Sequence, residues 1–80
     1  MPKLKRISGK ELVKMLKAQG FVEMRQKGSH LRLMKKMLLE GCYITVPLHD
    51  EIDRGTLRSI SRSLERCLSE PVIAEIFYTK

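Results

Sequence analysis

The spacing of the apolar residues changes twice along this chain, and that change constrains the fold more than any other feature. Before Gly20 the apolar residues recur at helical spacing, between Leu12 and Leu16. From Phe21 to Pro47 they alternate with polar residues, which is the period of a half-buried strand. After Pro47 the helical spacing returns. The pattern predicts a helix, three strands and a second helix, and hence an α+β fold.

Ser8 and Glu11 mark where the first helix begins. Their separation of three residues is that of a capping box, in which each side chain accepts a hydrogen bond from the backbone N–H of the other. Gly20 is placed to end the helix as the residue after its C-cap. One face of this helix carries Leu12, Val13, Leu16 and Met15, and another carries a basic stripe of Lys10, Lys14 and Lys17.

Residues 21–26, 30–35 and 42–47 have the composition and period of three short strands. The first two are close enough to be joined by a tight turn, so the strands are expected to form an antiparallel meander. This turn consists of Lys27, Gly28 and Ser29.

The alternation in the second strand predicts which side chains share a face. Leu31 and Leu33 point one way, toward the core, and His30, Arg32 and Met34 point the other way. His30 and Arg32 are therefore expected together on the face that is turned away from the core.

A second helix is expected after Pro47, with Asp53 or Thr56 as its N-cap. Together with the first helix it should cover one face of the three-stranded antiparallel sheet. Its apolar stripe comprises Leu57, Ile60, Leu64 and either Cys67 or Leu68, and its basic stripe comprises Arg54, Arg58, Arg62 and Arg66.

Two apolar segments lie outside these elements. Met37, Leu38 and Leu39 separate the second and third strands, where they either extend the strands or meet a partner. The apolar C-terminal extension, residues 69–80, is expected to pack on the domain or to add an edge strand, which could be shared in a dimer.

Length, charge and cysteine content narrow the class of protein. Eighty residues make a single small domain, and a net charge of +7 favours a polyanionic partner such as nucleic acid. No apolar run reaches the roughly 18 residues of a membrane span, and residues 1–12 lack the apolar region of a signal peptide. Cys42 and Cys67 are far apart and match no metal-binding spacing, so we expect reduced thiols in a cytoplasmic protein.

His30 is the candidate for chemistry, because an imidazole has both protonation states available near neutral pH. Taken alone, a histidine after a hairpin turn is more often an ordinary surface residue. Gly28 and Ser29 could hold a phosphate oxygen with their backbone N–H groups, although the turn alone also requires glycine. Cationic side chains that could stabilise a phosphate nearby are Arg25, Lys27 and Arg32.

The second histidine, His49, would complete an acid and base pair, but its position just before a helix favours a structural role. Asp50 and Glu51 follow it without the spacing of a metal site. The sequence therefore predicts chemistry that needs no metal and no cofactor.

Three segments are specific in combination: "GF" at residues 20–21, where the first helix ends, "RQKGSH" at residues 25–30 and "VPLHDEIDRGTLRSI" at residues 46–60. Through these segments the sequence resembles, over about residues 8–68, the HicA toxins of HicA/HicB toxin-antitoxin systems. This resemblance implies a double-stranded-RNA-binding-domain-like α-β-β-β-α fold and an RNA-cleaving toxin that a HicB-type antitoxin protein holds inactive. It also implies that His30 is the catalytic residue, with Gly28 and Ser29 matching the same motif. The apolar loop at residues 35–41 and the apolar C-terminal extension depart from the family pattern.

The sequence therefore predicts an endoribonuclease toxin that acts on mRNA in the cytoplasm, and that can form an oligomer with its antitoxin. The competing hypothesis is a non-catalytic double-stranded-RNA-binding-like module. Such a module would hold RNA through Lys10, Lys14, Lys17 and the arginine stripe of the second helix, and would form no product. In the toxin, too, these basic stripes are expected to bind an RNA backbone or an acidic antitoxin surface.

Overall fold

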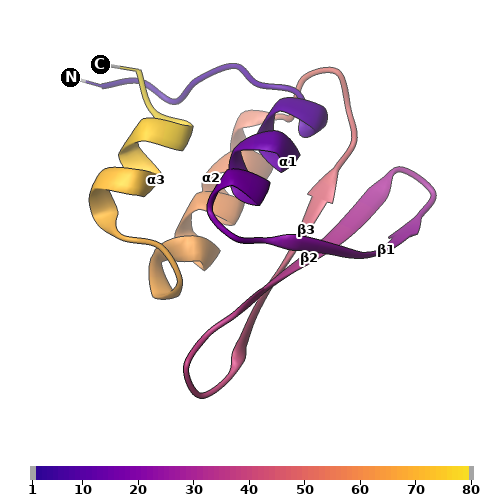
Figure 1. The fold of residues 1–80 in the computed structure, drawn as a ribbon. Coiled ribbons are helices and arrows are strands. Elements are labelled where there is room, and N and C mark those ends of the chain that lie inside the picture. The colour runs from indigo at the N-terminus through magenta and orange to yellow at the C-terminus, as the bar shows by residue number, and fades with distance from the viewer. Residues whose placement is uncertain (1, 80) are drawn as a thin grey trace.

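The computed structural model describes residues 2–79, and its elements follow the predicted order (Figure 1). Helix α1 (Gly9–Ala18) precedes the strands β1 (Val22–Lys27), β2 (His30–Lys36) and β3 (Gly41–Pro47). Helix α2 (Arg54–Ser63) continues into a short 3-10 helix, η1 (Leu64–Arg66), and helix α3 (Glu70–Phe77) follows. The strands form one antiparallel sheet in the order β1-β2-β3. The predicted α-β-β-β-α order and the α+β class are confirmed, and α3 is an addition to them.

The ends of the two main helices are capped as their sequences suggest. Ser8 is the N-cap of α1, and Ser8 and Glu11 make both hydrogen bonds of the capping box, at 2.9 and 3.1 Å. Gly20 follows the C-cap with a φ of +96°, a left-handed conformation that glycine adopts without strain. Of the two candidate caps of α2, Asp53 is the N-cap, and its carboxylate accepts a hydrogen bond from the Thr56 backbone N–H at 3.1 Å.

The strand register separates the side chains of the sheet into two faces. Leu31 and Leu33 of β2 lie opposite Val46 and Ile44 of β3, and all four are buried. His30, Arg32 and Met34 alternate with these leucines and lie on the other face, opposite Pro47, Thr45 and Tyr43. We call this second face the outer face.

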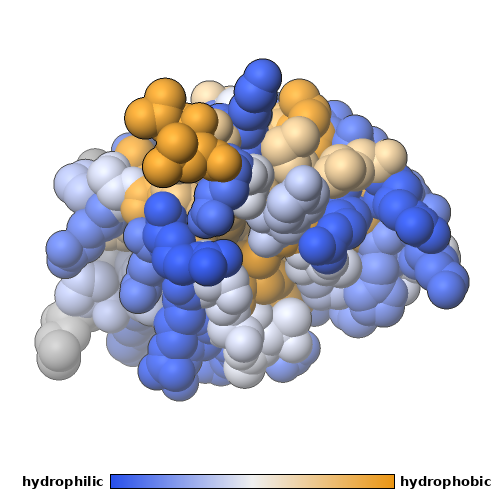
Figure 2. Space-filling model, turned by 90° about the horizontal axis from the view of Figure 1, so that it is seen from below, coloured by the Kyte–Doolittle hydropathy of each residue, from blue (hydrophilic) through white to orange (hydrophobic). Residues whose placement is uncertain are grey.

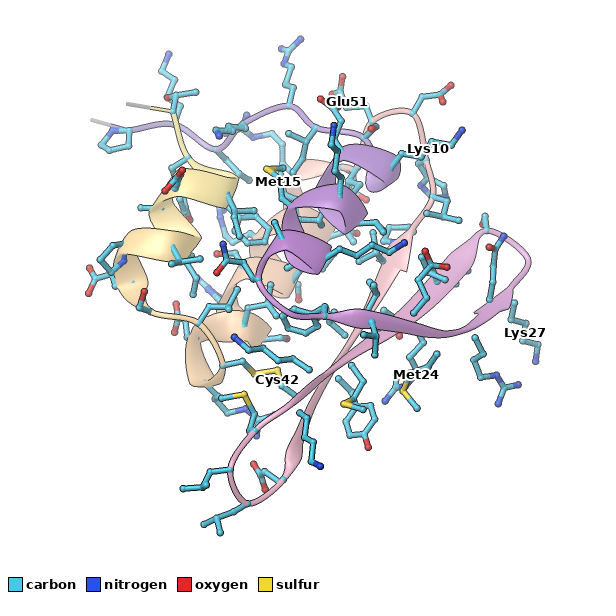
Figure 3. All side chains as sticks on the ribbon, viewed as in Figure 1. Lys10, Met15, Met24, Lys27, Cys42 and Glu51 are labelled. Carbon is cyan, nitrogen blue, oxygen red and sulfur yellow. A yellow bond between two sulfur atoms is a disulfide. The ribbon has the colours of Figure 1, made fainter. Side chains whose placement is uncertain are left out.

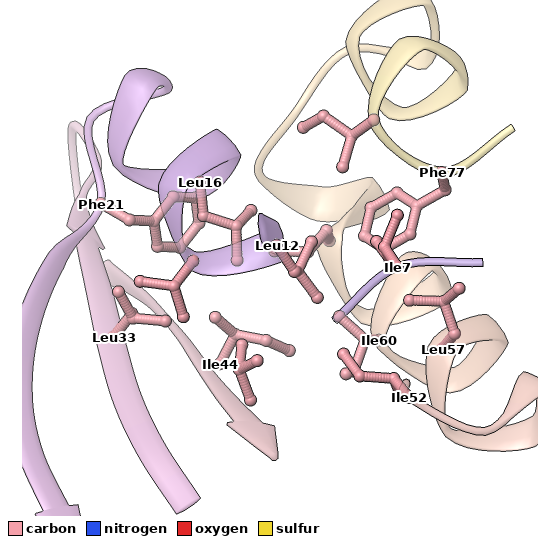
Figure 4. Packing of buried hydrophobic residues seen from close by; sticks show 14 of the residues in the cluster. Ile7, Leu12, Leu16, Phe21, Leu33, Ile44, Ile52, Leu57, Ile60 and Phe77 are labelled. Atoms are coloured by element: carbon pink, nitrogen blue, oxygen red, sulfur yellow. The ribbon is translucent and has the colours of Figure 1, made fainter. Parts of the chain in front are cut away.

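Helices α1 and α2 cover the inner face, where one apolar core joins the layers (Figures 1 and 4). Leu12 and Leu16 of α1 and Leu57 and Leu64 of α2 and η1 are almost fully buried. The predicted apolar stripes of both helices are therefore confirmed. The β1–β2 hairpin projects beyond the helices, and all residues of β1 are exposed.

The C-terminal extension forms α3, which lies beside α2 on the side away from the sheet (Figure 1). Ile73, Ile76 and Phe77 are buried, because this short helix turns them toward the core. Tyr78 also makes an isolated bridge with Leu4. The prediction that the extension packs on the domain is confirmed, and the alternative of an added edge strand in the sheet is wrong.

Residues 37–40 form a loop between β2 and β3 and do not extend either strand. The Met37 backbone N–H donates to the Glu40 carbonyl at 2.8 Å, which closes the loop, and the Met37 side chain packs on the core. Leu38 and Leu39 are left 98% and 94% exposed. The alternative that this segment extends the strands is therefore wrong, and contact with a partner stays a prediction.

Cys42 and Cys67 form a disulfide, so the prediction of two reduced thiols is wrong (Figure 3). The inner face of β3 presents Cys42, and the chain after η1 brings Cys67 to it, with the two Cα atoms 6.2 Å apart. This distance lies within the range of roughly 4.4–6.8 Å found for disulfides. Their separation of 25 residues in sequence carries no information about this proximity in space.

Reduction of this disulfide should destabilise the fold. A cross-link that spans 25 residues restricts the unfolded chain, and its loss should lower the free energy of unfolding by about 3 kcal/mol. Chemical denaturation with and without a thiol reductant measures this difference. The double variant Cys42→Ala/Cys67→Ala serves as the control, because its stability should not respond to reductant. An equal response of the two proteins would show that the disulfide does not stabilise the fold.

Candidate active site on the outer face of the sheet

The candidate site begins at the turn between β1 and β2, where Gly28 and Ser29 connect Lys27 to His30. Gly28 has a φ of +60°, and it is the first central residue of the two-residue turn, as in type II′ hairpins. The side-chain amide of Gln26 donates to the Gly28 carbonyl at 3.0 Å and braces the turn. Apart from its two chain neighbours, no described residue has an atom within 4 Å of the position that a Gly28 Cβ would occupy, so the turn is open to an approaching ligand.

Three of the candidate cations share the outer face with His30. In the register of β1 and β2, Lys27 lies opposite His30 and Arg25 lies opposite Arg32. Residues that are directly opposite in an antiparallel pair point to the same face of the sheet. A bulge between Glu23 and Arg25 shifts the register by one residue, so that Arg25 rather than Met24 lies opposite Arg32. The structure thus brings together His30, Arg25, Lys27 and Arg32, all of them exposed.

The side chain of Arg32 is held by two residues of β3. Its Nη1 donates to the Thr45 hydroxyl at 3.1 Å, and its guanidinium carbon lies 5.2 Å from the centroid of the Tyr43 ring. The second distance is within the roughly 6 Å of a cation–π contact. Sequence reasoning missed Thr45 and Tyr43 as neighbours of the site. The alternation in "CYITVP" could have placed both on the outer face, but their pairing with Arg32 needed the strand register.

Figure 2, which views the molecule from below, shows hydrophobic side chains interleaved with hydrophilic ones on this side. Met24 and Lys27 lie beyond the sheet, away from the helices (Figure 3). Val22, Met24 and Tyr43 are about half exposed. The outer face is therefore a mixed basic and apolar surface that no other element of the described chain covers.

His49 lies close to His30, with 6.5 Å between the ring centroids and the ring planes at 69°. Two backbone hydrogen bonds place it there. The Leu48 N–H donates to the Ser29 carbonyl at 2.6 Å, and the Gly9 N–H donates to the His49 carbonyl at 2.9 Å. The segment that follows β3 is thus attached both to the turn that precedes His30 and to the start of α1.

Gly9 is required for this arrangement, because α1 begins directly against the end of β3. A Cβ at Gly9 would overlap the Pro47 carbonyl oxygen and would lie 2.7 Å from the Leu48 Cα. A Cβ essentially never makes non-bonded contacts this short, so a side chain here would push the segment that carries His49 away from α1.

The basic stripe of α1 does not join this group. Lys10, Lys14 and Lys17 are exposed on the helix that covers the inner face, and Lys17 pairs with Glu23. Figure 3 shows Lys10 on the helix side of the sheet. Lys10 directly follows Gly9, so it is the member of the stripe that lies toward the His49 end of the site. The stripe is therefore separate from the outer face.

The carboxylates near His49 are on the loop that leads into α2. The pKa of the Asp53 carboxyl is lowered from its ordinary value, first by hydrogen bonds from the Thr56 side chain and backbone, and least by the charge of His49. Asp50 and Glu51 precede it and are exposed. Negative charge thus lies on the His49 side of the site, and positive charge lies on the His30 side.

Within residues 2–79, no group of three or more His, Cys, Asp or Glu side chains is arranged to hold a metal ion. An open groove of about 1230 Å³ lies between α3, α2 and the N-terminal segment, and Lys5, Glu65 and Tyr78 line parts of it. It contains neither histidine and none of the predicted site residues. The outer face remains the place where the predicted residues meet.

Comparison with protein families gives a match over most of the chain. The family model described as HicA toxin of bacterial toxin-antitoxin matches residues 9–66, which include α1, the whole sheet, α2 and η1. The turn, both histidines and the three outer-face cations lie inside the matched range, and α3 lies outside it. No curated protein and no solved structure shows significant similarity to the chain. No helix of the described residues is long and apolar enough to cross a membrane.

Proposed function

Since the chain belongs to the family of HicA toxins of bacterial toxin-antitoxin systems, we propose that it is an endoribonuclease that cleaves mRNA with His30 as a catalytic residue. The observation that carries this proposal is the arrangement on the outer face, where His30 lies among Arg25, Lys27 and Arg32 beside an open glycine turn. This is the combination of a proton-transfer group and phosphate-binding cations that RNA cleavage needs.

RNA supplies its own nucleophile, the 2′-hydroxyl of the ribose. Cleavage then requires a base to take the 2′-OH proton, an acid to protonate the leaving 5′-oxygen, and positive charge to stabilise the phosphorane. Attack by the 2′-oxygen leaves a 2′,3′-cyclic phosphate and a 5′-hydroxyl. His30 can serve as the base or the acid, because neutral and protonated imidazole are both available near neutral pH.

The charges of the outer face favour a bound phosphate. Arg25 and Arg32 lie directly opposite each other, and like charges in such a pair repel. A phosphate between them would remove this repulsion and accept hydrogen bonds from both guanidinium groups. Thr45 and Tyr43 keep Arg32 oriented before the phosphate arrives, so less side-chain freedom is lost on binding. The backbone N–H groups of Gly28 and Ser29 could take further phosphate oxygens.

We also propose that a HicB-type antitoxin holds the toxin inactive and that mRNA is met in the cytoplasm. The cations of the outer face could bind an acidic surface of the antitoxin in the same way as they would bind a phosphate backbone. Leu38 and Leu39, which are almost fully exposed, give it an apolar contact. In the C-terminal extension, Ile73, Ile76 and Phe77 of α3 are buried and are not available for this contact.

Substituting both leucines, as in Leu38→Ser/Leu39→Ser, should weaken the complex with the antitoxin and leave RNA cleavage unchanged. Binding to the antitoxin encoded beside this chain can be measured by titration calorimetry, with cleavage assayed in parallel. Loss of two buried leucine contacts should raise the dissociation constant by at least about tenfold. An unchanged dissociation constant would exclude this loop from the antitoxin interface.

The variant His30→Ala should bind RNA but form no cleavage product, because it keeps the cations and loses the proton-transfer group. The imidazole is exposed, so the fold should be retained, which a thermal melt can check. We expect a rate loss of at least about 10²-fold, measured on a test transcript with a chelator present throughout. Wild-type cleavage in chelator would agree with the prediction that no metal is needed.

Three results would contradict the proposal. Cleavage by His30→Ala at the wild-type rate would remove this residue from the chemistry. Wild-type cleavage that is lost in chelator and restored by a divalent ion would show a metal-dependent reaction. Salt-dependent RNA binding by the wild type without any product would indicate the non-catalytic module instead.

A further inference from the structure

The side chain of His49 has no structural task that the described residues reveal. It is exposed, and no hydrogen bond links its ring to any other residue within 2–79. The structural contact at this position comes from its backbone carbonyl, which accepts the Gly9 N–H at the start of α1, whereas the N-cap of α2 is Asp53. The imidazole itself is held beside His30 and is free to meet a ligand.

We propose that His49 is the general acid that completes the catalytic pair with His30, an inference that rests on the proposed ribonuclease function. A separation of 6.5 Å between the ring centroids is too long for a hydrogen bond between a nitrogen of one ring and a nitrogen of the other. Both rings therefore keep free nitrogens that can address two oxygens of one phosphate bound against the pair. Each imidazole could then reach one reacting oxygen at a hydrogen-bond distance of about 2.6–3.2 Å.

The backbone explains why this spacing is fixed. Ser29 immediately precedes His30, and its carbonyl accepts the N–H of Leu48, which immediately precedes His49. His30 also lies opposite Pro47 in the sheet register. The backbone segments that carry the two histidines are therefore held together by the sheet and one further hydrogen bond. A fixed pair of proton-transfer groups avoids the cost of assembling the pair during the reaction.

The surrounding charges assign the two roles. Cations from β1 and β2, namely Arg25, Lys27 and Arg32, share the outer face with His30, and they disfavour a further positive charge placed among them. On the side of His49, the loop before α2 contributes Asp50, Glu51 and Asp53, whose carboxylates attract positive charge. The start of α1 adds Lys10 and Glu11, which are of opposite sign. His30 is thus suited to act as the base, and His49 as the acid.

The reaction balances with these two groups alone. A neutral ring nitrogen of His30 takes the proton of the 2′-hydroxyl as the 2′-oxygen bonds to phosphorus. The bond from phosphorus to the 5′-oxygen breaks, and protonated His49 gives its proton to that oxygen. The products are a 2′,3′-cyclic phosphate and a 5′-hydroxyl, and the two histidines have exchanged protonation states.

The test compares two substrates that differ in the leaving atom. An oligoribonucleotide that spans a mapped wild-type cleavage site is made in its ordinary form and with sulfur in place of the bridging 5′-oxygen at that site. A thiolate leaves without protonation, so this substrate needs a base but no acid. His49→Ala is assayed on both substrates, and His30→Ala serves as the matched control with the other histidine removed.

We expect His49→Ala to cut the ordinary substrate about 10²–10⁴-fold more slowly than the wild type, and to approach the wild-type rate on the sulfur substrate. His30→Ala should stay slow on both. The alkaline limb of the wild-type pH profile, which reports loss of the protonated acid, should flatten in His49→Ala.

Two outcomes overturn the assignment while leaving the proposed function intact. One is a His49→Ala variant that cuts the ordinary substrate as fast as the wild type. The other is a variant that is slow on both substrates to the same degree, which would indicate a role in binding or positioning. If the wild type cuts neither substrate nor any test transcript, the proposed function fails and this assignment fails with it.

Discussion

The burial of Leu31 and Leu33 under the helices is the constraint on which the site depends. Leu33 is completely buried and Leu31 nearly so, and burying a leucine side chain contributes roughly 1.5–3 kcal/mol. Because strand side chains alternate, these two anchors fix the direction of every other residue in β2. A slip of one residue would turn His30 and Arg32 into the core and expose both leucines. The same alternation of side chains in β2 therefore stabilises the core and places His30 and Arg32 on the outer face.

A second constraint links the site to the rest of the fold. Two backbone hydrogen bonds hold the segment after β3 in place. The Leu48 N–H donates to the Ser29 carbonyl in the turn before His30, and the Gly9 N–H at the start of α1 donates to the His49 carbonyl. Gly9 permits this contact because the end of β3 leaves no space for a side chain. His49, which is distant from His30 in sequence, is thereby placed by the contact between a helix end and a strand end. These contacts explain why the two histidines form a unit.

Local patterns in the sequence were sufficient to predict the helices, the strands, the turn and the outer-face position of His30 and Arg32. Each of these depends on spacing within one element, such as the capping box at Ser8 or the alternation around Leu31. The disulfide, the contact of Arg32 with Thr45 and the approach of His49 depend on pairing between distant segments, for which the sequence has no local signal. The C-terminal helix was missed because "VIAEIFYTK" is apolar enough to suit either a helix or a strand.

In a reducing compartment the disulfide between Cys42 and Cys67 would be open to reduction, which makes the stability of this small domain sensitive to the redox state of its surroundings.

Mapping the surface that binds RNA tests most directly whether the outer face is the active site. An oligonucleotide with 2′-O-methyl riboses cannot be cleaved, and its binding to the ¹⁵N-labelled protein can be followed by amide chemical shifts in NMR. If RNA binds on the outer face around His30, the largest chemical-shift changes should fall on β1, on the turn at Gly28 and Ser29, on His30 and Arg32, and on His49. The basic stripes of α1 and α2 should change little. Changes concentrated on those helices, with the outer face unaffected, would contradict an active site on the outer face.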